Sequence, residues 1–261
     1  MSSRSSTTRH RTKMCQARCL PSKAHHIFRL AAVTGIFFVS PPLVSAEAPG
    51  DSGYDVSSVP EDKLRSAYFA GGCFWGVQSL FDGHWEGVKD VYVGYMGGKS
   101  ENPTYEEVVS AGKQATAKKQ AGGGETDDVH LEAIQIVYDP ERVSFGQLTR
   151  HFFEIHDPTQ VDRQGPDVGV QYASRIWWND QKELETIRHI VGLLEKKGYK
   201  VATTFEKHRA SDHKFWHAED YHQDYYVKNG QEPYCHHHED RGLAYDRDTG
   251  EIVADTVTDD L

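Results

Sequence analysis

This sequence has few cysteines, no long hydrophobic run and no apparent internal repeat. Four of its 261 residues are cysteine, too few for a framework of several disulfides. The main apolar run, residues 30–39, is too short to cross a bilayer comfortably. No repeat marks a solenoid or a propeller, so these absences leave a globular domain as the expected class.

Acidic residues are missing from the first 46 positions, which hold seven Lys and Arg residues instead. The basic stretch is followed by the apolar run, by Pro41-Pro42 and by Val44-Ser45-Ala46. This order is typical of a secretory signal peptide cleaved after Ala46, so we expect export to a periplasm or to the exterior. The stretch is long for a signal peptide, and the alternatives are initiation at Met14 or a transit peptide for an organelle.

Removing residues 1–46 changes both the charge and the thiol content of the chain. About 215 residues remain, which is one domain of ordinary size, and the net charge falls from −10 to −17. The negative charge of the remaining chain disfavours nucleic acid and anionic membranes as partners. We expect the protein to be a monomer. The two remaining thiols, Cys73 and Cys235, predict either a structural disulfide across a long loop or a reversible redox pair.

The run Gly71-Gly72-Cys73-Phe74-Trp75-Gly76 lies where a strand-like segment meets the start of a predicted helix. Unpaired amide hydrogens and the helix dipole favour a thiolate at that position. Phe74 and Trp75 add apolar surface, so the sulfur could react while the site holds an apolar group. The alternative is a buried core cysteine that has no reaction to perform.

Strand-like and helix-like segments alternate through one predicted domain, residues 63–235, which follows a linker at residues 47–62 and precedes a tail at residues 236–261. Helices are expected to begin at Cys73, Thr104, Ser144 and Asp180. Residues 112–128, which include three consecutive glycines, are expected to form a flexible inserted loop. A hairpin turn is predicted at residues 248–250. Strands are expected at residues 66–70, 87–95, 129–138, 171–178 and 200–205.

Three polar side chains lie where a nucleophilic thiol could use them. Strand periodicity puts Glu132 on one face with Ile134 and Ile136, and burial there would keep its carboxyl protonated as a general acid. Exposure at a strand end is the alternative. Tyr105 and Tyr172 follow turns, and their hydroxyls could donate hydrogen bonds to a substrate oxygen or serve in packing.

Histidines gather in the C-terminal third, at His213 and His217 and in the tract His236-His237-His238-Glu239. Both patterns can bind metal ions. The sequence has no His-Glu-x-x-His motif and only one cysteine nearby, so we expect no functional metal site. We expect instead a polar helix followed by a solvated, histidine-rich tail.

Eight short motifs, in the order in which they occur, resemble those of the peptide-methionine (S)-S-oxide reductases, the A-type methionine sulfoxide reductases. They cover residues 66–235, and their combination is highly specific. The motifs are Gly72-Cys73-Phe74-Trp75-Gly76, Gly94-Tyr95-Met96-Gly97-Gly98, Asn102-Pro103-Thr104-Tyr105, Tyr138-Asp139-Pro140, His156-Asp157-Pro158-Thr159, Arg163-Gln164-Gly165 with Asp167, Gln171-Tyr172, and Ala218-Glu219-Asp220-Tyr221-His222-Gln223.

The resemblance implies an α+β fold, a two-layer sandwich related to the ferredoxin-like fold. It implies reduction of the S epimer of methionine sulfoxide, free or within proteins. Cys73 would attack the sulfoxide sulfur and become a sulfenic acid, while Glu132 protonates the oxygen.

The resemblance also implies which side chains bind the substrate. The methyl group would lie against Phe74 and Trp75. Tyr105 and Tyr172 would bind and polarise the sulfoxide oxygen. Asp167 would hold a polar part of the substrate or a water molecule.

Cys235 would then condense with the sulfenic acid, and a thioredoxin-like dithiol would reopen the Cys73–Cys235 disulfide without a metal or an organic cofactor. The family pattern is altered before Glu132, where only His130-Leu131-Glu132 remains of a longer motif. It is altered again after Cys235, where the histidine tract replaces a glycine-rich stretch and a further cysteine. A non-catalytic module that binds or senses oxidised methionine is the alternative function.

Overall fold

The computed structural model of the protein describes residues 54–124, 128–209, 213–247 and 249–254. The predicted leader, residues 1–46, and the first part of the predicted linker lie outside these residues. No helix of the described ranges combines the length and the apolar character that crossing a membrane requires.

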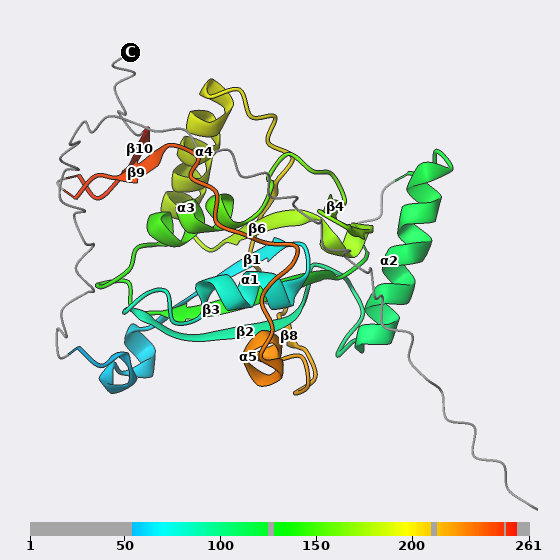
Figure 1. The fold of residues 1–261 in the computed structure, drawn as a ribbon, viewed down its shortest axis with the longest axis horizontal. Coiled ribbons are helices and arrows are strands. Elements are labelled where there is room, and N and C mark those ends of the chain that lie inside the picture. The colour runs from blue at the N-terminus through cyan, green and yellow to red at the C-terminus, as the bar shows by residue number, and fades with distance from the viewer. Residues whose placement is uncertain (1–53, 125–127, 210–212, 248, 255–261) are drawn as a thin grey trace, which may run out of the picture. The chain divides into compact units, whose positions relative to one another are not determined.

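A mixed six-stranded sheet forms the centre of the domain, in the order β7-β6-β1-β3-β2-β8 (Figure 1). Neighbouring strands are antiparallel except β6 and β7, which are parallel. These strands are β1 (Arg65–Gly71), β2 (Val88–Met96), β3 (Leu131–Tyr138), β6 (Ser174–Trp178), β7 (Thr204–Lys207) and β8 (Trp216–His217). Two short antiparallel pairs lie outside the sheet, β4 (Arg163–Gln164) with β5 (Asp167–Val168), and β9 (Leu243–Tyr245) with β10 (Ile252–Ala254).

Each predicted helix start is confirmed, because Cys73, Thr104, Ser144 and Asp180 all stand immediately before a helix. The last three accept a hydrogen bond from the backbone N–H three residues further on, which pairs an otherwise unpaired amide. The α-helices are α1 (Phe74–Phe81), α2 (Tyr105–Gln120), α3 (Phe145–Ile155), α4 (Gln181–Lys196) and α5 (Tyr225–Asn229). Short 3-10 turns occupy Val56–Ser58, Glu61–Lys63 and Val170–Tyr172.

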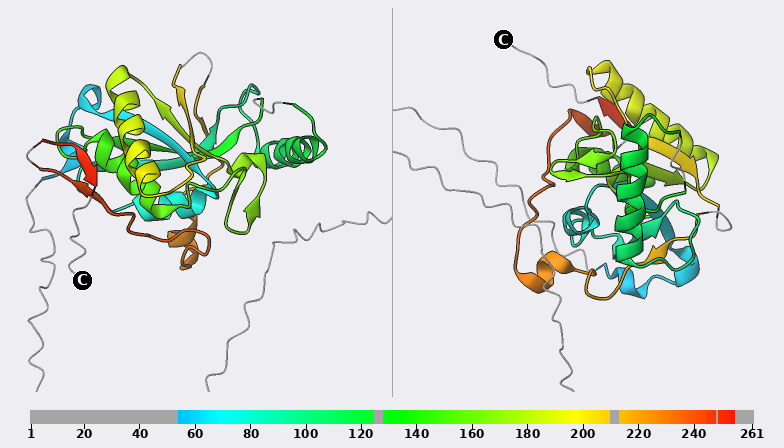
Figure 2. Two further views of the ribbon diagram at one scale, coloured as in Figure 1. Left: turned by 90° about the horizontal axis from the view of Figure 1, so that it is seen from above. Right: turned by 90° about the vertical axis from the view of Figure 1, so that its right-hand side faces the viewer.

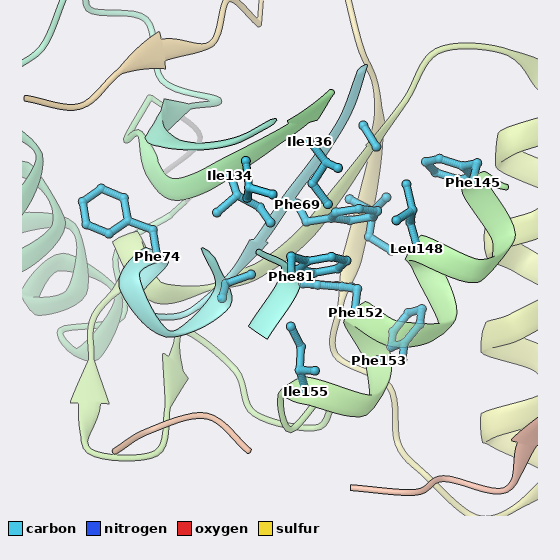
Figure 3. Packing of buried hydrophobic residues seen from close by; sticks show 14 of the residues in the cluster. Phe69, Phe74, Phe81, Ile134, Ile136, Phe145, Leu148, Phe152, Phe153 and Ile155 are labelled. Atoms are coloured by element: carbon cyan, nitrogen blue, oxygen red, sulfur yellow. The ribbon is translucent and has the colours of Figure 1, made fainter. Parts of the chain in front are cut away.

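The main hydrophobic core lies between one face of the sheet and helices α1, α3 and α4. Figure 3 shows Phe69, Ile134 and Ile136 of the sheet meeting the side chains of α1 and α3. The Phe69 ring stacks on Phe81 and Phe152, with centroids 5.9 and 4.9 Å apart. This packing holds α1 rigidly on the sheet, and the α+β fold class implied by the resemblance is confirmed.

Helix α2 corrects the prediction of a flexible loop at residues 112–128. The helix continues to Gln120, and Ala115 is buried beside Trp177 on the second face of the sheet. Figure 2 shows α2 standing apart from the other long helices, near the β4–β5 pair. The lysines, glutamines and alanines of residues 113–120 are good helix formers, and the glycine run that suggested a loop begins only after the helix ends.

Two predicted strands also differ from the observed ones. Residues 170–172 form a 3-10 turn, so β6 begins at Ser174 and not at residue 171. Strand β7 begins at Thr204, four residues later than predicted. Both errors lie at strand ends, where pairing with a neighbouring strand decides the boundary.

The C-terminal segment corrects the prediction of a polar helix and a solvated tail. His217 lies in β8 and not in a helix. His236 and Arg241 are buried, and Leu243 and Ile252 belong to the main core. The antiparallel pairing of β9 with β10 confirms the predicted hairpin, whose apolar side chains reach α3 and α4. Residues 236–247 and 249–254 are therefore a packed part of the domain.

Replacing Ser144 with alanine is expected to lower the free energy of unfolding by about 1 kcal/mol. The Ser144 hydroxyl accepts a hydrogen bond from the Gln147 N–H, and the Gln147 side chain accepts one from the Ser144 N–H in return. Chemical denaturation measures the loss. Ser144→Thr keeps a hydroxyl acceptor and should lose much less, so equal losses in both variants would contradict the capping role.

Candidate active site

Cys73 occupies the sharp connection between β1 and α1. Gly71 ends the strand, and Phe74 begins the helix. Gly72 between them has a φ of 102°, which favours glycine, and a Cβ at this position would lie 2.4 Å from the Cβ of Gln164. The connection therefore presents Cys73 at the start of a helix, in a nearly buried position with 7% of the residue exposed.

Glu132 lies on β3 with its carboxyl group against the first turn of α1. The residue is 2% exposed, and its Oε2 accepts a hydrogen bond from the Phe74 N–H at 3.1 Å. Burial raises the pKa of Glu132 well above its usual value, and the charge of a Cys73 thiolate raises it further, against a smaller lowering by the Phe74 N–H. The burial predicted from strand periodicity is confirmed, and the carboxyl group holds a proton that it can donate beside Cys73.

Cys235 brings the second thiol to the first. The sulfur atoms of Cys73 and Cys235 and a carboxylate oxygen of Asp167 lie within 4.8 Å of one another, and both cysteines are free. His236 holds this arrangement, because its Nε2 donates to the Gly71 carbonyl at 2.7 Å. Its Nδ1 is then an acceptor, and the Cys235 thiol lies 3.0 Å away. The segment that carries Cys235 is thus docked on the connection that presents Cys73.

The proximity of the two thiols reverses one prediction about Cys73. Its pKa is raised well above the ordinary value, whereas the helix start predicted a thiolate. The hydrogen bond with Cys235 is the largest cause and burial is the next, while the Trp75 N–H lowers the pKa without prevailing. Cys73 is therefore a protonated thiol while Cys235 is docked, and displacement of Cys235 would remove the largest opposing cause.

The two aromatic residues that follow Cys73 in the first turn of α1 have different surroundings. Phe74 is 1% exposed and packs in the main core. Trp75 is half-buried, its ring stacks on Tyr225 with centroids 3.6 Å apart, and its indole N–H donates to Nδ1 of His222 at 3.0 Å. The wall that these two side chains would form beside the thiol stays a prediction, and Trp75 is fixed by two partners that the sequence did not identify.

The hydroxyl groups of Tyr105 and Tyr172 interact electrostatically with Glu132 and Cys73. Burial raises the pKa of both, and the charge on Glu132 is the next cause for each. The charge of Cys73 also contributes to both shifts. Both hydroxyls therefore keep their protons and can donate hydrogen bonds near Glu132 and Cys73.

Asp167 offers an acceptor beside the thiols. Its Oδ1 accepts a long hydrogen bond from the Tyr234 hydroxyl at 3.5 Å, while its buried Oδ2 has no partner among the described residues. Burial raises the pKa of Asp167, and its interaction with the neighbouring Cys235 thiol lowers it in part. A buried oxygen without a partner is suited to a polar group of a ligand or to a water molecule.

Three residues of the site were given no role from the sequence. Glu219 accepts hydrogen bonds from the Tyr95 hydroxyl at 2.8 Å and from the Tyr105 N–H at 3.0 Å, and so positions the start of α2. His222 positions Trp75. Both belong to the motif 218–223, which was the available signal. Tyr226 carries a buried hydroxyl without a partner among the described residues, and nothing in the sequence marks it. Burial raises the pKa of Tyr226 most, and the charges of the two thiols raise it further.

The site also offers three possible metal ligands, the side chains of Cys73, Asp167 and Cys235. A metal ion that prefers sulfur ligands would bind only if both thiols were thiolates. The site can therefore either bind such an ion or exchange thiols and disulfides.

A cavity of about 950 Å³ lies elsewhere, between the loop after β2 and strand β7. None of its lining residues belongs to the thiol site.

A thiol at the start of a helix, a protonated carboxyl group beside it and a second thiol within reach define a thiol-dependent oxidoreductase with an α+β fold. The family follows from comparison with known proteins. A sequence model described as peptide methionine sulfoxide reductase matches residues 65–249. The chain belongs to this family.

Relatives and solved structures agree with that assignment. The chain is 41% identical over 172 residues to a peptide methionine sulfoxide reductase MsrA of Nautilia profundicola, covering 66% of this chain and 88% of that protein. It is 42% identical over 171 residues to the MsrA of Erwinia tasmaniensis, covering 65% and 85%. The crystal structure of Mxr1 from Saccharomyces cerevisiae in reduced form is similar with a TM-score of 0.58 and 29% identity, over 69% of this chain and 95% of that one. Methionine sulfoxide reductase A of Corynebacterium diphtheriae gives a TM-score of 0.54 and 33% identity, over 66% and 78%.

Proposed function

We propose that this protein reduces methionine-S-sulfoxide, free or within proteins, to methionine through the thiol of Cys73. The observation that carries the proposal is the convergence of three groups. Cys73 stands immediately before α1, the Glu132 carboxyl accepts a hydrogen bond from the Phe74 N–H, and the sulfur of Cys235 lies within 4.8 Å of that of Cys73.

The first step transfers oxygen from the substrate to Cys73. The sulfur of Cys73, as its thiolate, attacks the sulfoxide sulfur and forms a bond to it, while Glu132 donates a proton to the sulfoxide oxygen. The protonated oxygen then passes to the Cys73 sulfur as the substrate S–O bond and the new S–S bond break, so methionine leaves and Cys73 becomes a sulfenic acid. The Cys73 thiol loses one proton and the sulfoxide oxygen gains one. The proton lost by Cys73 can therefore return Glu132 to its acid form.

The second step uses Cys235. Its sulfur attacks the sulfenic sulfur of Cys73, a disulfide forms and water leaves. A thioredoxin-like dithiol then reduces the disulfide and is itself oxidised to a disulfide, so the cycle needs neither a metal nor an organic cofactor. The docking of Cys235 by His236 supports this role, because the two sulfur atoms already lie near one another in the free thiol state.

The substrate roles follow the positions of the surrounding side chains. Tyr105 and Tyr172 hold protonated hydroxyls near Glu132 and can bind the sulfoxide oxygen. Phe74 and Trp75 supply the wall for the methyl group, and the unpaired Oδ2 of Asp167 can hold a polar group or a water. In the proposed cycle the substrate displaces Cys235 from Cys73 before the first step.

We further propose that the protein works as an exported monomer, periplasmic or secreted, after removal of residues 1–46. The basic, apolar and small-residue order of the leader supports export, and targeting to an organelle is the alternative. Repair of oxidised proteins follows from the proposed reduction, and the acidic charge of the remaining chain disfavours nucleic acid as a partner. Cell fractionation with an antibody to the protein tests the location.

A single-turnover experiment tests the proposed cycle. The reduced protein, without added reductant, is mixed with the S epimer of a blocked methionine sulfoxide. About one methionine per chain and the loss of two hydrogens from the protein are expected. Product with a stable sulfenic acid would remove Cys235 from the cycle. No product from folded protein would overturn the reductase and favour a module that only binds oxidised methionine.

Replacing Gly76 with alanine is expected to slow formation of the Cys73–Cys235 disulfide by about tenfold or more. A Cβ at position 76 would lie 2.3 Å from Nδ1 of His236, so the ring must leave the Gly71 carbonyl and take Cys235 with it. The burst of one methionine should remain. Rapid quenching, thiol alkylation and mass measurement give the rate.

Gly192→Ala is the matched control for this variant. Gly192 also lies inside a helix, but no atom lies within 4 Å of a Cβ placed there. The control should form the disulfide at the unaltered rate. Equal rates in the two variants would show that docking by His236 does not set the speed of this step.

A further inference from the structure

A second cluster of polar side chains lies where the C-terminal segment crosses α3. His151 and Glu154 are one turn apart on α3, and His238 comes from the segment that follows Cys235. One nitrogen or oxygen atom of each residue lies within 4.8 Å of those of the other two. The proposed reduction of methionine sulfoxide uses none of these three side chains.

The ring of His151 is held in one orientation. Its Nε2 lies 2.8 Å from the Leu80 carbonyl, which can only accept, so the ring hydrogen is on Nε2 and Nδ1 carries a lone pair. The edges of Phe81 and Trp85 pack against the ring, at centroid distances of 4.9 and 5.8 Å, and His84 stacks on it at 4.3 Å. Histidines that bind metals are commonly fixed in this way, with the other nitrogen donating to a carbonyl.

Glu154 and His238 complete the cluster, Glu154 from α3 and His238 from the C-terminal segment that crosses α3. The Glu154 side chain is 3% exposed, and its Oε1 accepts a hydrogen bond from Arg150 at 2.7 Å. Its Oε2 lies 3.3 Å from Nε2 of His238, whose side chain is 51% exposed. The Glu239 N–H donates to the Glu154 carbonyl at 2.7 Å and fixes the backbone. The cluster is therefore ordered and open to solvent on one side.

We propose that His151, Glu154 and His238 bind a divalent transition-metal ion of the zinc class. Two imidazoles and one carboxylate suit such an ion better than Mg²⁺ or Ca²⁺, which prefer oxygen ligands, and the fourth position is left for water. The ion replaces the hydrogen bond between His238 and Glu154 and ties the chain to α3 three residues after Cys235. This site departs from the expectation of no metal, and it does not depend on the reductase activity.

Binding of Zn²⁺ and Co²⁺ to the untagged full chain tests the site. The four cysteines are replaced by serine, because Cys73 and Cys235 with Asp167 could hold the same ions. Equilibrium dialysis should find about one Zn²⁺ per chain. Bound Co²⁺ should show d–d absorption of nitrogen and oxygen ligands. The proposal would be overturned if no ion bound, or if several ions bound to each chain with equally low affinity.

Variants separate this site from the histidine tract as a whole. His238→Ala and Glu154→Gln should each weaken Zn²⁺ binding about tenfold or more. His237→Ala is the control, because His237 is exposed in the same tract and is not part of the cluster. Circular dichroism checks that the variants fold, and His238 is half-exposed, so its loss should leave the fold intact. Equal affinities for the His238→Ala and His237→Ala chains would contradict the proposed site.

Discussion

Replacing Cys73 with serine is expected to abolish methionine formation, a loss on the order of 10⁴-fold or more. A serine hydroxyl keeps its proton at neutral pH, is a poor nucleophile toward sulfur, and cannot form a disulfide with Cys235. Steady-state turnover with a dithiol reductant and the single-turnover assay both measure the loss.

Cys235→Ser is the matched control for this prediction. It removes a neighbouring thiol but leaves Cys73, so it should still form about one methionine per chain and then stop as a sulfenic acid. Its Cys73 should also ionise at lower pH, since the hydrogen bond with Cys235 is the largest cause of the raised pKa. A Cys73→Ser protein that forms methionine at the unaltered rate would overturn the proposed function.

Replacing Glu132 with glutamine is expected to lower kcat by about 10² to 10⁴-fold. The amide oxygen of glutamine can still accept the Phe74 N–H, so the position of α1 is kept, but the amide has no proton to transfer. The comparison therefore isolates proton donation from packing. Glu132→Asp, which keeps the acid and shortens its reach, should retain more activity than the amide.

The pH dependence of kcat gives a second readout for Glu132. The active form is the protonated carboxyl, and burial raises its pKa well above the usual value. Activity that depends on this proton is therefore present below the raised pKa and lost as the pH rises through it. The Glu132→Gln variant should lack this alkaline decrease. An identical decrease in both proteins would assign it to another group.

The sequence predicted those parts of the site that depend on local pattern. Ser144 and Asp180 precede apolar stripes at helical spacing, and both cap the helices expected of them. Period two placed Glu132 with Ile134, and both are buried. The start of α1 directly after Cys73 follows from the glycines before it. Each of these predictions rests on neighbours within a few residues, where backbone geometry leaves few choices.

The predictions that were wrong depend on contacts between distant residues. The raised pKa of Cys73 comes first from Cys235, which is far away in the sequence, and no local pattern could show that the two thiols meet. The burial of His236 depends on the absence of a side chain at Gly76 and on the hydrogen bond to the Gly71 carbonyl. Helix α2 was underestimated because a glycine run just beyond its end outweighed the helix formers before it.

The segment that carries Cys235 is fixed at both of its ends. Helix α5 lies against α1 through the stack of Tyr225 on Trp75, and the β9–β10 hairpin is anchored by Leu243 in the main core (Figure 1). The intervening residues 230–242 form a closed loop and not a free tail. In the proposed cycle, such a tether would give the Cys235 thiol an effective concentration on the order of millimolar or more at Cys73.

That tether bears on survival of the enzyme under oxidative attack. Peroxide must meet the sulfenic acid by diffusion to carry it to the irreversible sulfinic acid, whereas Cys235 is supplied by the chain itself. Attack by Cys235 within the chain is therefore expected to be faster than attack by peroxide from solution. In the proposed cycle, closing the loop on both sides would shorten the time during which the Cys73 sulfenic acid is exposed to overoxidation.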